Sequence, residues 1–131
     1  MTSAADIRHW QTLTFRDADR MMTWLAAIDF AEHATYRDDS DPAVVVHAEW
    51  IRPGGAGIMF GSVREDGVGA SGPGTAACYL VVDDPDAVFE SAVAAGASVV
   101  APMIDQDYGG RGGTVSDPEG NLWSFGSYQP R

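Results

Sequence analysis

A histidine and a glutamate stand two residues apart in the segment VVHAEWI, at positions 47 and 49. In an extended strand, side chains at i and i+2 point to the same face, so His47 and Glu49 are expected side by side. Such a pair can act as a general base or can anchor a polar or cationic group of a ligand. The two side chains can also pair with each other or face solvent, with no role in binding or catalysis. The sequence leaves these three interpretations open.

A second candidate group is the segment DYGGRGG, residues 107–113, which contains Tyr108 and Arg111. An arginine on a glycine-rich loop can clamp a carboxylate with its planar guanidinium. It can equally pair with Asp107 or Glu119 and hold the loop in place. The glycines do not form a phosphate-binding fingerprint, because none lies between a strand and the start of a helix.

The elements that position these residues repeat along the chain. Residues 12–30 and 78–97 share the order of strand, capping aspartate and amphipathic helix, with Asp17 and Asp84 as the expected caps. An internal repeat of about half the chain indicates two modules. The expected apolar helix faces consist of Met21, Trp24, Leu25 and Ile28 in the first half, and of Val88, Phe89, Ala92 and Val93 in the second.

Three strands are expected after each helix, bounded by turns rich in Gly, Pro and Asp. Each half therefore has the order β-α-β-β-β, and the chain is expected to form a single domain over residues 1–131. The first module covers about residues 8–63 and the second about residues 76–128, with the glycine-rich residues 64–75 as a linker. The expected strands are 31–37, 43–51 and 55–63, then 97–103, 112–117 and 122–128.

Composition restricts the classes of function. The net charge of −11, from 8 basic and 19 acidic residues, does not favour nucleic-acid binding, which depends on Lys and Arg. Apolar stretches are too short to span a bilayer, so no membrane partner is expected. Cys78 is the one cysteine and lies in an apolar segment, which indicates a buried thiol. With no secretory signal evident, a cytoplasmic protein is expected.

The duplicated pattern resembles the vicinal oxygen chelate superfamily, which comprises glyoxalases, bleomycin-resistance proteins and extradiol dioxygenases. The resemblance rests on TFRDADRMMTWL, YLVVDDPDAVFESAVAAGA and DYGGRGGTVSDPEGNLWSFG, and it covers about residues 10–128. It implies an α+β fold in which the eight strands of two tandem βαβββ modules curl into an incomplete barrel. The helices would lie outside, the ligand inside, and the protein would be a homodimer.

The resemblance also supplies a test for a metal. Catalytic members hold a divalent ion with His, Gln or Glu from the first and fourth strands of each module. The corresponding residues here are Trp10, Met59, Ala77 and Ser124, none of which suits a hard divalent ion. A shift of one residue would bring Gln11 to the first position, but it would turn that side chain to the other face. We therefore expect no metal and no cofactor.

Alternation along the strands predicts which side chains face the barrel interior. His47 and Glu49 are expected to share a face with Val45 and Ile51, and they are the candidates for catalysis. A mixture of aromatic and a few polar groups suits an organic ligand. The expected ligand-binding residues are Trp10, Thr12, His47, Glu49, Met59, Tyr79, Tyr108, Arg111 and Ser124.

The expected function is metal-independent binding of a small organic ligand in the barrel cavity. The resemblance to bleomycin-resistance proteins, which sequester a bulky cationic antibiotic, and the acidic composition both suit a cationic ligand. The alternative is an enzyme of the same superfamily, a lyase, isomerase or dioxygenase. It would use a rebuilt metal site or acid–base catalysis by His47 and Glu49. A regulatory or scaffolding module is a third class, and the sequence favours binding over catalysis.

Overall fold

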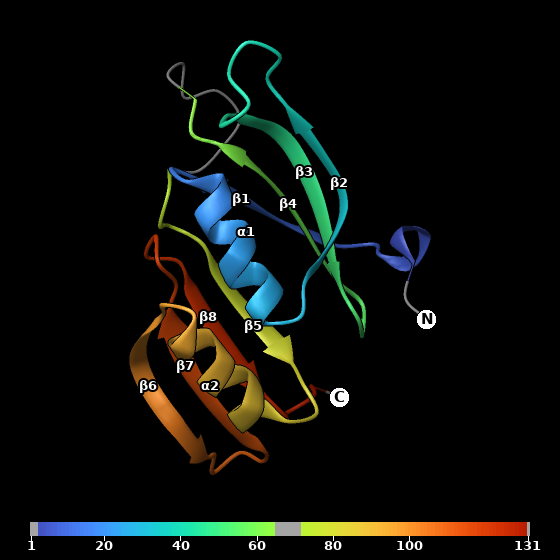
Figure 1. The fold of residues 1–131 in the computed structure, drawn as a ribbon. Helices are drawn as coiled ribbons and strands as arrows, with labels where there is room; N and C mark the ends of the chain where they lie inside the picture. The colour runs from blue at the N-terminus through green and yellow to red at the C-terminus, as the bar shows by residue number, and fades with distance from the viewer. Residues whose placement is uncertain (1–2, 65–71, 131) are drawn as a thin grey trace.

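The computed structural model describes residues 3–64 and 72–130, which form two four-stranded sheets with one α-helix each (Figure 1). The predicted α+β fold of two βαβββ modules is confirmed, and the two sheets do not close into a full barrel. Most of the expected linker, residues 65–71, lies outside the described residues.

A 3-10 turn, η1 (Ala4–Asp6), precedes the first module, which contains β1 (Trp10–Phe15), α1 (Ala18–Ala27), β2 (Ala31–Arg37), β3 (Val45–Arg52) and β4 (Ala56–Ser62). The second module contains β5 (Ala77–Val81), α2 (Pro85–Ala94), β6 (Ser98–Asp105), β7 (Arg111–Ser116) and β8 (Leu122–Gly126).

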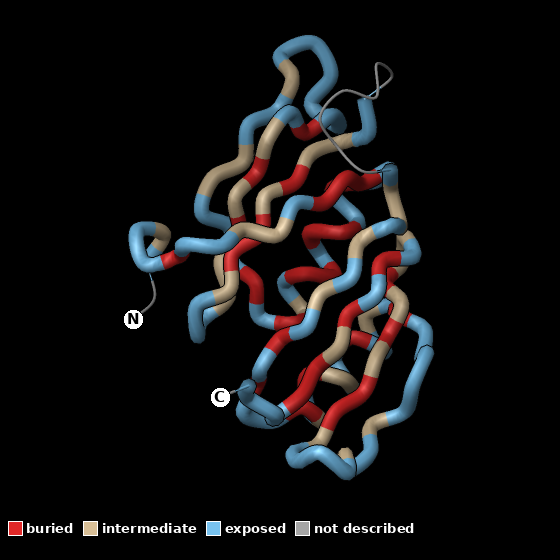
Figure 2. Tube along the Cα trace, turned by 180° about the vertical axis from the view of Figure 1, so that it is seen from behind, coloured by how far each residue is buried: buried red, intermediate tan, exposed pale blue. Residues whose placement is uncertain are grey.

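The two sheets have the same topology. The strand order is β1-β4-β3-β2 in the first sheet and β5-β8-β7-β6 in the second, with the β1–β4 and β5–β8 pairs parallel and the others antiparallel. Both helices lie on one side of the sheets in Figure 1, and Figure 2 shows the molecule from the opposite side. We call the side of each sheet away from the helices its open face.

Each helix begins at the aspartate predicted to cap it. The Asp17 carboxylate accepts a hydrogen bond from the backbone N–H of Arg20 at 3.0 Å, and Asp84 accepts one from Ala87 at 3.2 Å. These contacts satisfy N–H groups that have no partner within the first helical turn. Beyond α2 the chain turns at Gly96, whose φ of 122° favours glycine.

The apolar face of α2 differs from the prediction at one residue. Val88 and Ala92 are buried and Phe89 packs against the core, but Val93 is 37% exposed. The prediction for Val93 was therefore wrong. The buried stripe of α2 runs through Pro85, Val88 and Ala92, and Val93 is turned about 100° around the helix from Ala92.

Aromatic side chains join the two modules. The Trp24 ring of α1 lies 5.4 Å from that of Trp123 in β8, and Phe30 contacts Trp123 edge-on at 6.0 Å. The Trp24 indole N–H also donates to the Ala92 carbonyl of α2 at 3.0 Å, so the tryptophan is buried without an unsatisfied donor. The rest of the predicted α1 face, Met21, Leu25 and Ile28, is fully buried as well.

A buried carboxylate organises the turn between β7 and β8. Asp117, only 4% exposed, accepts hydrogen bonds from the backbone N–H groups of Glu119 (2.8 Å) and Asn121 (3.0 Å). It also accepts from the Asn121 amide and the Trp123 indole N–H, both at 2.9 Å. Asn121 in turn accepts from the backbone N–H of Ala76, just before β5. The DPEGN segment is a turn, as predicted, and it also orients Trp123.

The same turn reaches across to the first module. The Glu119 carboxylate accepts from the backbone N–H groups of Arg16 (2.6 Å) and Asp17 (2.7 Å), immediately before α1. In the other direction, the Arg20 guanidinium donates to the Ala95 carbonyl at the end of α2, at 3.1 Å. A carboxylate at a helix start and a cation at a helix end both complement the helix dipole, so each module stabilises a helix end of the other.

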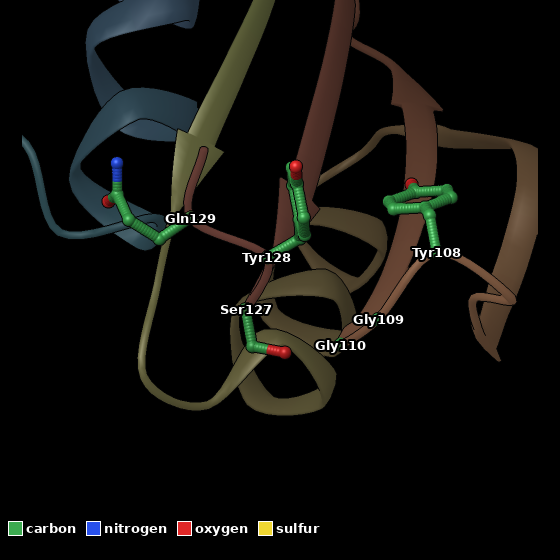
Figure 3. Close-up of a pocket in the computed structure, with 6 residues that line it drawn as sticks. All are labelled: Tyr108, Gly109, Gly110, Ser127, Tyr128 and Gln129. Carbon is green, nitrogen blue, oxygen red and sulfur yellow. The ribbon is translucent and has the colours of Figure 1, made fainter. Parts of the chain in front are cut away.

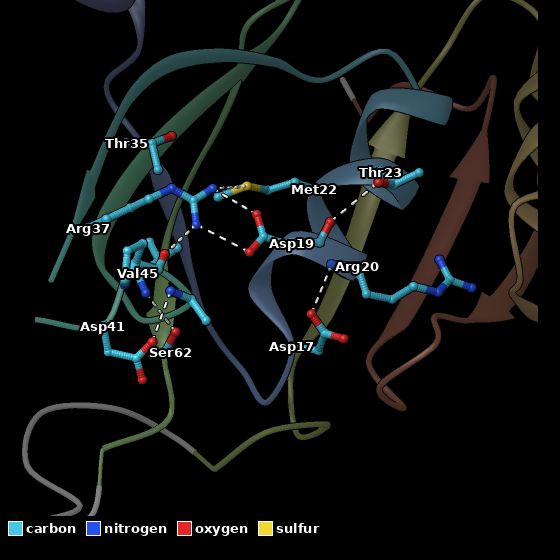
Figure 4. Close-up of polar contacts among 12 residues, drawn as sticks. Asp17, Asp19, Arg20, Met22, Thr23, Thr35, Arg37, Asp41, Val45 and Ser62 are labelled. Atoms are coloured by element: carbon cyan, nitrogen blue, oxygen red, sulfur yellow. Dashed lines mark hydrogen bonds and ion pairs between the residues drawn. The ribbon is translucent and has the colours of Figure 1, made fainter.

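Each module also ties an aspartate in the first turn of its helix to an arginine of its sheet. Arg37 of β2 holds Asp19 with two hydrogen bonds of 2.7 and 3.2 Å (Figure 4). Arg111 of β7 holds Asp86 with two of 2.8 and 3.1 Å. Hydrogen bonding from the arginine lowers the pKa of the carboxyl group in both pairs. Because the arginines come from strands that do not correspond, the same contact is built in two different ways.

Replacing Asp117 with alanine is expected to lower the free energy of unfolding by about 3 kcal/mol or more, because buried N–H groups of Asn121 and Trp123 lose their acceptor. Chemical denaturation measures the change. Asp107→Ala is the control, since Asp107 is exposed and makes no hydrogen bond or ion pair within the described residues. It should shift the same free energy by less than about 0.5 kcal/mol. Equal effects of the two substitutions would contradict the role given to Asp117.

The Cys78 thiol is expected to be unreactive in the folded protein. Burial raises the pKa of Cys78 to about 12, and the charge of Asp117 adds to the shift. Because the thiolate is the reactive form and the pKa rises from 9.0 to about 12, alkylation at pH 8 should be on the order of a thousandfold slower than in denatured protein. The folded state should also lose stability as the pH rises from about 9 towards 12, since the unfolded thiol ionises first. Equal alkylation rates in native and denatured protein would contradict this.

Candidate functional site

The candidate residues of the first module form a row across its open face. The strand register places Thr12 of β1 beside Met59 of β4, and Met59 beside Glu49 of β3. All three are exposed or half-buried, whereas the alternating residues Leu13 and Phe60 are buried on the helix side. The pleat therefore turns the predicted polar row away from the core.

Trp10 lies at one end of this open face and packs on glycine. A Cβ atom at Gly57 would come within 2.7 Å of the Trp10 ring and within 2.8 Å of the Ile7 side chain. Only glycine leaves room for the indole across β4, which is why Gly57 stands opposite Trp10 in the register. The packing leaves Trp10 half-buried and limits the positions of its ring.

His47 and Glu49 are in contact. The His47 Nε2 and Glu49 Oε2 atoms are 2.9 Å apart, and the side chains are 42% and 29% exposed. The Tyr36 ring of β2 stacks beside the imidazole, with centroids 6.3 Å apart and planes at 18°. The three side chains form one partly exposed polar group that can hold a ligand or exchange a proton.

Val45 was predicted to lie on the same face of its strand as His47 and Glu49, and this prediction was wrong. His47 pairs with Tyr36 but Val45 pairs with Arg37, so β3 carries an additional residue, Val46, at this step. This β-bulge turns Val45 into the core, where it is 1% exposed, and leaves Val46 63% exposed. Strict alternation could not predict the change, because a bulge interrupts the two-residue period.

The open face of the second sheet carries hydroxyl groups in the equivalent row. Tyr79 lies beside Ser124, and Ser124 beside Thr114, with the two aliphatic hydroxyls 2.7 Å apart. The Tyr79 hydroxyl donates to the Tyr128 carbonyl at 2.9 Å. A Cβ atom at Gly126 would collide with the Tyr79 ring, so this tyrosine lies across β8 as Trp10 lies across β4.

Arg111 is engaged by carboxylates of its own module. Its guanidinium binds Asp86 of α2 at 2.8 Å and Asp105 of β6 at 3.3 Å, rather than Asp107 or Glu119. These contacts leave it 39% exposed and raise its pKa, chiefly through the hydrogen bond to Asp86. The guanidinium is therefore fixed against α2, and a ligand carboxylate would have to compete with Asp86 for it.

The predicted binding residues do not line one hollow. Tyr108 borders a hollow of about 590 Å³ near the C-terminus (Figure 3). Tyr79 borders a cleft of about 290 Å³ where β1 and β4 approach β5, and Thr12 borders a small one of about 30 Å³. The hollow beside Tyr108 also involves residues that sequence reasoning missed, Gly109, Gly110, Ser127, Tyr128 and Gln129. Of these, Tyr128 could have been noticed as a second tyrosine at the end of the last predicted strand.

The residues at the four metal-ligand positions do not fit a divalent ion. Trp10, Met59 and Ala77 offer no oxygen or nitrogen donor that suits such an ion. The Ser124 hydroxyl shares a hydrogen bond with Thr114. Within residues 3–64 and 72–130, no group of three or more His, Cys, Asp or Glu side chains is placed to hold a metal.

Among the helices that the structure describes, none has the length and apolar character needed to cross a membrane.

Comparison with solved structures finds the same fold. TioX from Micromonospora sp. ML1 is 28% identical with a TM-score of 0.69, over 95% of this chain and 98% of TioX. A bleomycin resistance determinant encoded on transposon Tn5 is 18% identical with a TM-score of 0.65, over 94% and 98% of the two chains. A bleomycin-binding protein in complex with bleomycin is 19% identical with a TM-score of 0.61, over 93% and 98%.

A more similar sequence matches over a shorter stretch. An uncharacterized protein of Mycobacterium bovis is 50% identical over 48 residues, which cover 37% of this chain and only 32% of that relative's length. The family model described as Glyoxalase/Bleomycin resistance protein/Dioxygenase superfamily matches residues 7–125. The resemblance read from the sequence is confirmed: the chain belongs to the Glyoxalase/Bleomycin resistance protein/Dioxygenase superfamily.

Proposed function

We propose that the protein binds a small organic ligand on the open faces of its two sheets, without a metal ion. The observation that carries the proposal is the row Thr12, Met59 and Glu49, continued by the His47–Glu49 contact, on a face that no helix covers (Figure 2). Such a mixture of apolar and convergent polar groups is typical of small-molecule sites. The fold shared with a bleomycin-binding protein supports the same class of function.

The chemistry of the face favours a cationic ligand. Glu49 supplies a partly exposed carboxylate, and the second sheet supplies the hydroxyls of Tyr79, Ser124 and Thr114 as neutral acceptors. The net charge of −11 attracts cations towards the whole molecule. Trp10, held on Gly57, supplies an aromatic surface for a flat group of the ligand.

Acid–base catalysis is the second candidate function, and the His47–Glu49 contact favours it. With Nε2 of His47 held by Glu49 at 2.9 Å, Nδ1 is the nitrogen that would take a proton from a bound substrate. An enzyme of this kind would be a lyase or isomerase. In a turnover assay, His47→Gln should then abolish product formation.

A homodimer is the assembly that we propose. The open face of the second sheet exposes Val81, Ile104 and Leu122, each between 41% and 50%. Exposed apolar side chains gathered on one sheet face are typical of an interface.

We expect sedimentation at micromolar concentration to give twice the chain mass of 13.9 kDa. Leu122→Glu places a charge on the proposed interface and should give a monomer with an unchanged circular dichroism spectrum. Glu90→Gln on α2, which changes a charge on the helix side, should remain dimeric. A wild-type monomer would contradict the proposed assembly.

Substitutions on the open face should separate the contributions to ligand binding. For compounds found by thermal-shift screening, Trp10→Ala should weaken binding about fivefold whatever the ligand charge, since a stacked ring adds about 1 kcal/mol. Glu49→Gln should weaken a cationic compound about tenfold and a neutral analogue far less. Isothermal titration calorimetry measures both, with Glu90→Gln as the control.

Unchanged affinity in both variants, with the fold intact, would place the binding site elsewhere. One tightly bound metal equivalent per chain in purified protein would contradict metal independence. These two outcomes are distinguishable, because elemental analysis needs no ligand.

A further inference from the structure

Two tyrosines form a right-angled corner at the end of the second sheet. The Tyr108 and Tyr128 rings have centroids 5.1 Å apart and planes at 90°, and both border the hollow of about 590 Å³ (Figure 3). Tyr108 is 60% exposed and Tyr128 is 36% exposed. Each ring therefore contacts the other and still presents surface to the hollow.

The backbone beneath the rings is closely packed. Gly109 and Gly110 have φ values of 114° and 73°, and a Cβ atom at Gly110 would lie 2.8 Å from the Tyr128 backbone nitrogen. The Ser127 hydroxyl accepts a hydrogen bond from the backbone N–H of Arg111 at 2.9 Å. The loop that carries Tyr108 and the segment that carries Tyr128 are thus held together, so the corner exists before any ligand arrives.

Tyr79 supports this pair of rings, which we call the tyrosine corner (Tyr108 and Tyr128). Its hydroxyl donates to the Tyr128 carbonyl at 2.9 Å. Burial raises the pKa of Tyr79, and the neighbouring Tyr108 and Tyr128 hydroxyls add to the shift. The phenol of Tyr79 therefore stays neutral over the physiological pH range.

The electrostatic surroundings of the corner favour a positive charge. Aromatic faces carry partial negative charge. Among the described residues, the arginine nearest to the corner in sequence is Arg111, and its guanidinium is bound by Asp86 and Asp105. The Asp107 side chain, next to Tyr108, makes no hydrogen bond or ion pair within the described residues.

We propose that the tyrosine corner binds a quaternary or methylated ammonium group of a ligand through cation–π contacts. Such a group is large and weakly hydrated, so it loses little when it leaves water for two aromatic faces, unlike a compact primary ammonium. The inference goes beyond the function proposed above, because neither ring of the corner belongs to the open-face residues and the corner does not require Trp10, His47 or Glu49.

The test compares choline with 3,3-dimethyl-1-butanol, which has the same shape without the charge. In an NMR titration, choline should give saturable shifts of the Tyr108 and Tyr128 ring signals and of the Gly109 and Gly110 amides. The neutral compound should bind at least about tenfold more weakly, because the cation–π attraction is absent. Equal binding of the two compounds, or no saturable binding of choline, would overturn the proposal.

Variants locate the site. Tyr108→Leu should weaken choline binding about tenfold, whereas Tyr108→Phe, which keeps the ring, should change it less than about twofold. Tyr128→Leu should have the same effect as Tyr108→Leu, and circular dichroism confirms that each variant is folded. Tyr36→Leu is the control, since Tyr36 is 59% exposed on the other sheet.

Unchanged choline binding in Tyr108→Leu and Tyr128→Leu would overturn the assignment to these rings. In Trp10→Ala and Glu49→Gln, choline should still cause the same saturable shifts of the Tyr108 and Tyr128 ring signals. The tyrosine-corner proposal can therefore fail while the open-face proposal holds. The open-face proposal can likewise fail while the corner binds choline.

Discussion

A carboxylate removed from water must be satisfied by hydrogen-bond donors, and the relative position of the two modules depends on how Asp117 meets this requirement. Its four hydrogen bonds shape the β7–β8 turn, fix Asn121 against the start of β5 and orient the Trp123 indole. Trp123 then packs against Trp24 and Phe30 of the first module. One buried anion thus connects a turn, a sheet and the centre of the contact between modules.

Around that centre, the helix side of the molecule is stabilised by contacts at helix ends. Glu119 caps the start of α1, Arg20 reaches the end of α2, and Arg37 and Arg111 hold the first helical turns. These groups therefore satisfy one another at the helix ends. The open faces differ from the helix side, because they present exposed aromatic rings, hydroxyl groups and one His–Glu pair. The contacts that stabilise the helices and the groups proposed to bind a ligand therefore lie on opposite sides of the same sheets.

Both modules build an aromatic surface by the same physical means. A large ring on the first strand lies across the neighbouring parallel strand, where glycine leaves room: Trp10 over Gly57 and Tyr79 over Gly126. At the four positions where the resemblance read from the sequence implied metal ligands, this chain carries aromatic, thioether, methyl and hydroxyl groups instead. The binding function proposed above therefore depends on shape, stacking and hydrogen bonds rather than on metal ligands.

Local signals in the sequence determined the repeated βαβββ order, the capping roles of Asp17 and Asp84, the buried face of α1 and the DPEGN turn. Each depends on residues close together in the chain. Tertiary structure alone decided the bulge at Val46, the exposure of Val93, the partners of Arg111, the reach of Glu119 to α1 and the meeting of Tyr108 with Tyr128. These features depend on pairing register or on side chains brought together from different strands and helices. No periodicity in one segment encodes such contacts, because their energy exists only once the sheets and helices have packed.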